Sequence, residues 1–326
     1  MKKFFRVLFP VKGDSGKEIL RKIAFLVALV VFFFSGGLLL NDLVFLPAQN
    51  QGTTDDIKQI YYQSSPSTSS QAEEQELSFQ ERMEALKAVN PDIKGWIQIP
   101  NTVIDYPVLQ SPVSDPEYYL THDYRKEYTK YGSIFADSNC ALDGTCQNII
   151  LYGHHMNDGQ MFADILNYTD LDFYKTSPVF TFHTDSYEGQ WKVVSVFRTN
   201  TLSSQGVPFA YNQIGFSSES AFLNFAYQLK IRSILDIPVD ILPTDELVTL
   251  STCSYELDDF RTVVVARRVR EGEDATVDVS QASWNNRVVY PDGWYERYGG
   301  SKPSWPATYE DAVAQGVITD TLLTAG

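Results

Sequence analysis

The sequence predicts a mainly β fold, a barrel or closed sandwich, and three observations lead to this prediction. Eight short segments rich in β-branched and aromatic residues occur between residues 95 and 269, and each is bounded by Gly, Pro, Asn or Asp. Only two helical patterns interrupt these segments, so strands and helices do not alternate as they do in βαβ units. The chain of 326 residues is long enough to form a large domain with its own core.

The amino terminus carries an apolar run that is long enough to cross a membrane. Residues 23–40 (IAFLVALVVFFFSGGLLL) are uncharged, and as a helix they span roughly 27 Å, close to the thickness of a bilayer core. Seven basic and two acidic residues lie in the preceding segment, residues 1–22. This asymmetry predicts a cytoplasmic basic tail and places everything after the run outside. We expect an uncleaved transmembrane signal-anchor at 23–46; the alternative is a cleaved signal peptide.

The charge of the remaining chain argues against one class of function. The whole chain has a net charge of −15, and its first 22 residues carry +5, which leaves −20 for the rest. A domain this acidic is repelled by nucleic acid and by an anionic membrane surface. We therefore expect no nucleic-acid partner, and contact with the membrane only through the amino-terminal helix.

A polar linker and a capped helix follow the apolar run. Residues 47–75 are rich in Ser, Thr and Gln, a composition typical of an extracellular flexible stalk. Ser78 and Glu81 form a capping box that starts a helix, and Asn90 with Pro91 ends it.

The eight predicted strands share their length, their composition and their flanking turn residues. They are residues 95–99, 102–109, 132–136, 148–152, 179–183, 191–197, 246–253 and 262–269. Helices are expected at residues 159–168 and 219–235, where apolar residues recur at helical spacing. Residues 271–326 are rich in Trp, Tyr, Pro and Gly, with a short helix expected near 310–315. Because exposed aromatic side chains are costly, we expect this segment to pack on the domain surface.

Two of the predicted strands end beside side chains that carry chemistry. His154 and His155 follow the strand at 148–152, and Cys253 ends the strand at 246–253. A neighbouring imidazole or cation raises the thiolate fraction of a cysteine, and Arg261 supplies a permanent charge nearby in the sequence. A cysteine, a histidine and an arginine are a complete set for acyl transfer through a thioester. The alternative is that Cys253 is a small buried hydrophobic residue.

The other two cysteines leave a disulfide and a metal site to consider. Cys140 and Cys146 lie in one polar stretch (CALDGTC), and outside the membrane they could pair, which would leave Cys253 unpaired. Together with the two adjacent histidines they would supply soft metal ligands. However, C-x5-C is not a usual zinc spacing, and adjacent residues on a strand point to opposite faces. We expect no metal and no cofactor.

These residues resemble the signature of a known enzyme family. TLSTC (249–253) and the arginine that opens RTVVVARR (261–268) are similar to the Thr-Leu-x-Thr-Cys and Arg motifs of sortases, the membrane-anchored cysteine transpeptidases of Gram-positive bacteria. LYGHHM (151–156) resembles the histidine segment in its class B form, and NPDIKGWIQIPNTVIDYPVLQ (90–110) resembles the class B opening. The resemblance covers roughly residues 77 to 269.

The resemblance implies a fold and a domain organisation. It implies an eight-stranded sortase-type β-barrel with amino-terminal helices and an inserted helix near 219–235. The catalytic domain would be residues 76–270, on the outer face of a membrane crossed once. Residues 271–326 continue beyond the usual end of the family domain, as a carboxy-terminal extension of unknown role. The chain also has Pro116 where class B enzymes often have Asn, so the resemblance does not specify the sorting motif.

The resemblance also implies roles for individual residues. Cys253 matches the nucleophile, His154 the catalytic histidine and Arg261 the catalytic arginine, whereas His155 matches no assigned role. The matching positions at the substrate groove and beside the oxyanion are Leu120, Tyr152, Ser251 and Ser254.

The implied reaction is cleavage of a carboxy-terminal sorting motif of surface proteins through a thioester acyl-enzyme. The acyl group would then pass to an amine acceptor of the cell wall, in a peptidoglycan precursor, or to a pilin lysine. Two alternatives are a hydrolytic cysteine peptidase and a non-catalytic, membrane-anchored surface scaffold.

Overall fold

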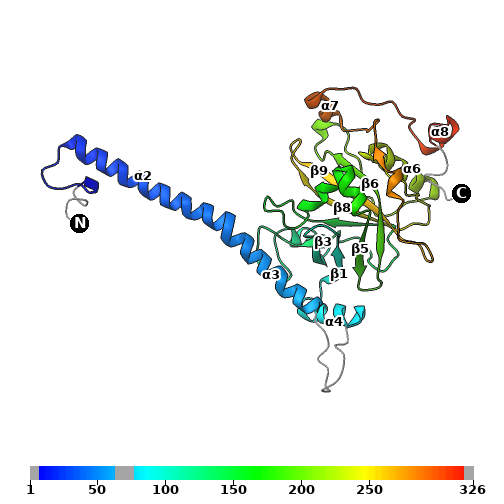
Figure 1. The fold of residues 1–326 in the computed structure, drawn as a ribbon, viewed down its shortest axis with the longest axis horizontal. Helices are drawn as coiled ribbons and strands as arrows, with labels where there is room; N and C mark the ends of the chain where they lie inside the picture. Colours follow the sequence, from blue (N-terminus) through cyan, green and yellow to red (C-terminus); the bar gives the residue numbers. More distant parts are fainter. Residues whose placement is uncertain (1–6, 63–76, 319–326) are drawn as a thin grey trace, which may run out of the picture. The chain divides into compact units, whose positions relative to one another are not determined.

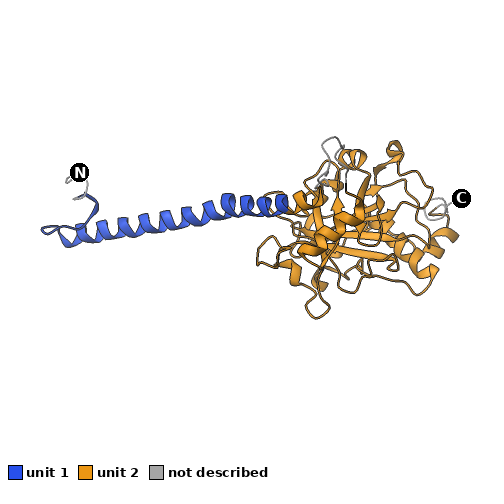
Figure 2. Ribbon diagram, turned by 90° about the horizontal axis from the view of Figure 1, so that it is seen from below, with its two compact units in different colours: residues 1–56 blue, residues 57–326 orange. Residues whose placement is uncertain are grey.

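The computed structural model describes residues 7–62 and 77–318 and divides the chain into two compact units, residues 1–56 and 57–326 (Figure 2). The first unit is dominated by α2 (Gly16–Leu40), which begins at Ser15, where the side chain accepts a hydrogen bond from the backbone N–H of Glu18. Its apolar side chains are largely exposed. The helix continues through η1 (Asn41–Phe45) into α3 (Leu46–Tyr61), and this stretch is long and apolar enough to cross a membrane.

The expectation of a flexible stalk at 47–75 is wrong for residues 47–61, which are helical, while residues 63–76 lie outside the described part. Packing overrides composition here, because most of the stability of a short helix comes from tertiary contacts. Ile57 and Tyr61 are four residues apart and buried. The ring of Tyr61 stacks on Trp96 at 4.0 Å between centroids, and Lys58 pairs with Asp105 at 3.2 Å.

The second unit contains a closed β-barrel (Figure 1). All eight predicted strands form, and all eight belong to the barrel, which confirms the predicted fold class. They are β1 (Ile93–Gln98), β2 (Asp105–Gln110), β3 (Ile134–Ala136), β4 (Asn148–Tyr152), β5 (Val179–Thr184), β6 (Gln190–Thr199), β8 (Leu247–Ser254) and β9 (Phe260–Arg268). Their order around the barrel is β1-β2-β3-β4-β8-β9-β6-β5. A short pair, β7 (Leu235–Asp236) and β10 (Ser283–Trp284), lies outside the barrel.

The strand directions bring distant parts of the sequence together at one end of the barrel. β4 and β8 are parallel neighbours, so their carboxyl ends lie side by side, with Tyr152 opposite Ser251. β9 runs antiparallel to β8, and its first residues therefore lie beside the last residues of β8. β6 follows on the other side of β9, with Thr199 opposite Arg261.

The helices around the barrel agree with the sequence in two places and differ in a third. α4 (Phe79–Val89) starts with the predicted capping box, and α6 (Glu219–Arg232) occupies most of the predicted 219–235 range. The helix expected at 159–168 is wrong. Gly159 and Met161 have φ values of +84° and +59°, which a helix cannot accommodate. The chain instead forms a 3₁₀ segment, η3 (Ala163–Thr169), and then α5 (Leu171–Thr176).

Four further short helices are η2 (Tyr118–Leu120), η4 (Ser203–Gln205), η5 (Val279–Gln281) and α7 (Asp292–Tyr298). The short helix expected near 310–315 is α8 (Tyr309–Ala314).

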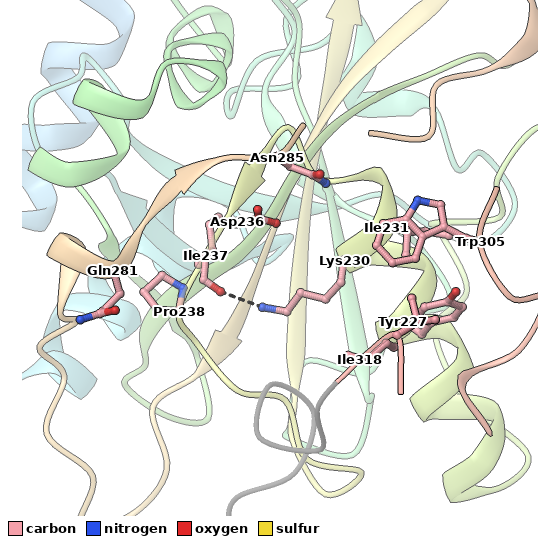
Figure 3. Close-up of a pocket in the computed structure, with 11 residues that line it drawn as sticks. Tyr227, Lys230, Ile231, Asp236, Ile237, Pro238, Gln281, Asn285, Trp305 and Ile318 are labelled. Atoms are coloured by element: carbon pink, nitrogen blue, oxygen red, sulfur yellow. Dashed lines mark hydrogen bonds between the residues drawn. The ribbon is translucent and has the colours of Figure 1, made fainter. Parts of the chain in front are cut away.

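The described part of the carboxy-terminal extension, residues 271–318, packs on the domain surface, as expected from its aromatic residues. Figure 3 shows Trp305 and Ile318 of the extension facing α6 across a pocket of about 420 Å³. On the α6 side, the ammonium of Lys230 donates hydrogen bonds to the carbonyls of Ile237, at 3.0 Å, and Val239, at 2.8 Å. Burial lowers the pKa of Lys230 to about 8.

Candidate active site

Cys253 is the second-last residue of β8 and lies directly opposite Arg261 on β9. Directly opposed residues on antiparallel strands point to the same face of the sheet, with their Cβ atoms about 5 Å apart. The thiol and the stem of the guanidinium therefore share one face at the end of the barrel. Both side chains are half-buried, whereas the flanking Thr252 and Ser254 are buried.

His154 follows β4 after one glycine, and the geometry of that glycine explains the sequence. A Cβ atom on Gly153 would lie 2.5 Å from Ile134 Cδ1 and 2.8 Å from the ring of Phe162, so no larger residue fits. The N–H of Gly153 donates to the Ser251 carbonyl at 3.3 Å, and its own carbonyl accepts from Thr252 Oγ1 at 2.7 Å. These two hydrogen bonds hold the end of β4 against β8, one residue before His154.

The His154 ring is oriented by a main-chain carbonyl. Its Nε2 lies 2.8 Å from the carbonyl oxygen of Leu120, in η2. A carbonyl can only accept a hydrogen bond, so Nε2 must carry the proton. In the neutral ring, Nδ1 is then the basic nitrogen. The predicted site residue Leu120 thus has a main-chain contact that the sequence could not reveal.

Arg261 has an uncompensated charge. Its Nη1 donates to the carbonyl of Phe260 at 3.0 Å, and no carboxylate in the described part of the chain forms an ion pair with it. A guanidinium without an internal counter-ion is suited to bind an oxyanion, because it offers several donors in a fixed plane.

His155, to which the sequence assigned no role, contacts the predicted nucleophile through the main chain. Its Nδ1 lies 3.1 Å from the carbonyl oxygen of Cys253. The ring stacks on Tyr255 at 5.1 Å between centroids, and the Tyr255 hydroxyl donates to the His155 carbonyl at 3.3 Å. The adjacent pair of histidines was the only signal in the sequence that pointed to this residue.

The remaining predicted site residues lie around the same strand ends but differ in exposure. Tyr152 is partly exposed, and its hydroxyl donates to Asp137 at 3.3 Å; burial raises the pKa of this hydroxyl, so it stays neutral. Ser251 is buried, and its hydroxyl is 2.9 Å from that of Tyr211. Ser254 is buried, and within the described part of the chain its side-chain oxygen has no hydrogen-bond partner.

Cys140 and Cys146 lie at the other end of β4 from the histidines. Both are buried and unbridged, and their sulfurs approach the carbonyl of Asn148 at 3.7 and 3.2 Å. A hydrogen bond with Cys146 and burial together raise the pKa of Cys140. The two cysteines and two histidines considered as metal ligands are therefore separated by the length of β4. Among residues 7–62 and 77–318, no three His, Cys, Asp or Glu side chains are grouped to hold a metal ion.

Comparisons with known proteins agree on one family. Residues 97–269 match the model of the sortase domain. A sortase B of Listeria monocytogenes is 34% identical over 242 residues, which are 74% of this chain and 93% of that protein. A sortase B of Staphylococcus aureus is 32% identical over 191 residues, 58% of this chain and 75% of that protein.

Solved structures give the same result. A Staphylococcus aureus sortase B–substrate complex superposes with a TM-score of 0.58 at 26% identity, covering 69% of this chain and 99% of that one. Sortase B from B. anthracis in complex with AAEK1 has a TM-score of 0.58 at 28% identity and the same coverage.

Proposed function

Because the chain belongs to the sortase family, in its class B, it is a cysteine transpeptidase, and we propose that it attaches surface proteins to an amine acceptor. In this proposal it cleaves a carboxy-terminal sorting motif through a thioester on Cys253. The acceptor is an amine of the cell wall, in a peptidoglycan precursor, or a lysine of a pilin. The observation that carries the proposal is the placement of Cys253 directly opposite Arg261, beside the strand end that leads into His154.

The first half of the reaction uses the thiol and the imidazole. His154 Nδ1 takes the proton of the Cys253 thiol, and the sulfur attacks the backbone carbonyl at the scissile bond. The new C–S bond forms as the carbonyl π electrons move to oxygen. When the tetrahedral intermediate collapses, the C–N bond breaks and the imidazolium returns its proton to the leaving amine.

The second half reverses these roles. The incoming amine attacks the thioester carbonyl and gives a proton to His154, and the Cys253 thiolate leaves and recovers its proton. Throughout, the Leu120 carbonyl holds the Nε2–H, so that one nitrogen performs every transfer. Arg261 and the backbone N–H of Ser254 stabilise the oxyanion in both halves.

Leu120, Tyr152, Ser251 and Ser254 are proposed to line or border the groove that binds the sorting motif. Support comes from their positions around the ends of β4 and β8 and from the contact between Leu120 and His154. One of the similar structures is a sortase B–substrate complex, which supports a substrate groove in this chain as well.

The proposed location is the outer face of a membrane crossed once, with the amino terminus in the cytoplasm. The long apolar helix supports a membrane anchor, and the seven basic residues before it favour the cytoplasmic side for the tail. The proposed domain organisation is a cytoplasmic tail (1–22), an anchor (23–46), a connecting segment (47–75), a catalytic domain (76–270) and the extension (271–326).

The decisive experiment offers a sorting-peptide library to the full-length protein in detergent micelles, with and without an amine acceptor. We expect an intact-mass increase on Cys253 equal to the acyl fragment, and a peptide–amine product when the acceptor is present. Cys253→Ala should abolish both, whereas Cys140→Ala, which changes a buried thiol at the far end of β4, should leave both intact. Full activity of Cys253→Ala would refute the proposal. Hydrolysis alone, unaffected by the amine, would favour the peptidase alternative, and an unreactive Cys253 the scaffold alternative.

A further inference from the structure

We propose that His155 is a positioning residue that fixes the peptide between Cys253 and Ser254 in the orientation needed for oxyanion binding. The inference rests on the proposed function, since it gives this peptide a catalytic purpose. The contact itself is independent of that function: Nδ1 of His155 lies 3.1 Å from the carbonyl oxygen of Cys253. Because the oxygen can only accept, Nδ1 carries the proton and the imidazole is the donor.

The position of this contact in the sheet explains why a side chain makes it. In a parallel ladder, the N–H groups of every second residue donate to every second carbonyl of the neighbouring strand. Gly153 N–H donates to the Ser251 carbonyl, so the next bond in the series would join His155 N–H to the Cys253 carbonyl. The His155 imidazole makes this bond in place of the backbone, one step beyond the end of β4.

Because the His155 side chain replaces the backbone donor, the main chain can leave the sheet after β4 while the Cys253 carbonyl stays hydrogen-bonded. The backbone after β4 turns back on itself: Phe162 N–H donates to the His154 carbonyl at 2.9 Å, and His155 forms an isolated bridge with Met161. One short turn therefore carries the His154 ring and, in the next residue, the contact to Cys253.

The ring of His155 is itself held in place. Tyr255 stacks against it, and the Tyr255 hydroxyl donates to the His155 carbonyl. Tyr255 is two residues beyond Cys253, so His155 contacts the chain on both sides of Ser254, at the Cys253 carbonyl and at the Tyr255 ring. An imidazole restrained in this way keeps its donor aimed at one oxygen.

The link to catalysis is the planarity of the peptide group. The Cys253 C=O and the Ser254 N–H belong to one rigid plane. A hydrogen bond at the oxygen fixes the direction of the N–H and polarises it as a donor. Loss of the His155 contact should therefore weaken transition-state stabilisation and leave binding of the ground-state peptide largely unchanged.

The test compares two amide substitutions in the full-length protein in detergent micelles. His155→Asn places an N–H where Nδ1 stands, two bonds beyond Cβ, and His155→Gln moves it one bond further out. Cys followed by Ser occurs once in the sequence, at 253–254. Labelling cysteine with ¹³C at the carbonyl and serine with ¹⁵N therefore gives one cross-peak in an HNCO spectrum, which reports on the hydrogen bond to Cys253.

We expect His155→Gln to shift the Cys253 carbonyl resonance upfield and to lower kcat by about tenfold, the size expected for one hydrogen bond. KM should change little. His155→Asn should restore both the resonance and kcat towards wild type. Equal loss in both variants, or an unmoved resonance in His155→Gln, would overturn the inference. If the resonance behaves as expected while the wild-type protein cleaves no peptide, the positioning contact stands and the proposed function fails.

Discussion

At the scale of the residue, Arg261 offers the clearest prediction because its charge has no internal counter-ion in the described part of the chain. Arg261→Lys keeps the charge but replaces a planar fork by a single ammonium. We expect kcat/KM for a sorting peptide to fall by about 10²-fold, the size seen when one oxyanion donor is removed. The melting temperature should stay nearly unchanged, since no ion pair is lost.

Arg268 provides the matched control for this substitution. It lies on the same strand, β9, at the end away from Cys253, and pairs with Glu246 at 3.3 Å. Arg268→Lys makes the same chemical change and should leave kcat/KM at the wild-type value. Equal losses of activity in both variants would mean that the guanidinium of Arg261 has no special part in the reaction.

The residues of the candidate site differed in how well the sequence revealed them. The sequence proposed Cys253, His154 and Arg261 because they belong to short motifs with fixed spacing. It did not reveal the contacts of the Leu120 carbonyl and the His155 ring, because both contacts involve main-chain oxygens, which every residue has. A sequence pattern records side-chain chemistry, whereas these two contacts depend on where the barrel brings separate strand ends together.

At the scale of the element, the sequence predicted what local chemistry determines. All eight barrel strands were recognisable from β-branched segments between turn residues, and α4 from its capping box. The helical state of residues 47–61 was not recognisable from the sequence, because it depends on packing against the distant Trp96, on which Tyr61 stacks. The 3₁₀ turn at 163–169 was missed because the left-handed backbone of Met161 has no reliable sequence signal.

The α7 helix of the extension lies against the loop that joins β8 to β9, which leads to a prediction about this loop. Trp294 stacks on Tyr290 at 4.3 Å and faces Phe260 at 6.3 Å, and the Tyr298 hydroxyl donates to the Glu256 carbonyl at 3.0 Å. Trp294→Ala should lower the free energy of unfolding by about 2 kcal/mol, less than for a fully buried tryptophan. Since Phe260 precedes Arg261, we also expect a several-fold loss of kcat/KM, measured beside the melting temperature.

Trp305 serves as the control because it belongs to the same extension but contacts a different part of the domain. Its indole N–H donates to the Arg287 carbonyl at 3.0 Å, and its ring faces Tyr227 of α6 (Figure 3). Trp305→Ala should lower the melting temperature without lowering kcat/KM. If both variants lose stability and neither loses activity, the extension supports the fold but does not influence the site.

At the scale of the whole molecule, a compact ion network joins the extension to the barrel. Glu273 lies just after β9 and accepts two hydrogen bonds from Arg267, each at 2.7 Å, and one from Lys192 at 2.6 Å. Arg267 is 1% exposed and also bonds Asp240 at 2.9 Å. The net charge of −15 gave no sign of this network, because composition does not show which charges are paired.

The network predicts a pH dependence of stability that a single substitution can isolate. The hydrogen bonds from Arg267 hold the pKa of Glu273 well below its ordinary value of 4.5. A carboxylate with a depressed folded-state pKa contributes stability above its unfolded pKa and loses that contribution as pH falls. We expect Glu273→Gln to lower the free energy of unfolding by about 2 kcal/mol at pH 7, since it leaves buried Arg267 with one partner fewer. The difference from wild type, measured by urea unfolding of the full-length protein in micelles, should shrink steadily below pH 4.5.

Glu271→Gln is the control: Glu271 is an exposed neighbour with no ion pair in the described part of the chain, so this variant should match wild type at every pH. A constant difference between Glu273→Gln and wild type from pH 7 to pH 3 would show that Glu273 is not held in its charged form by the network.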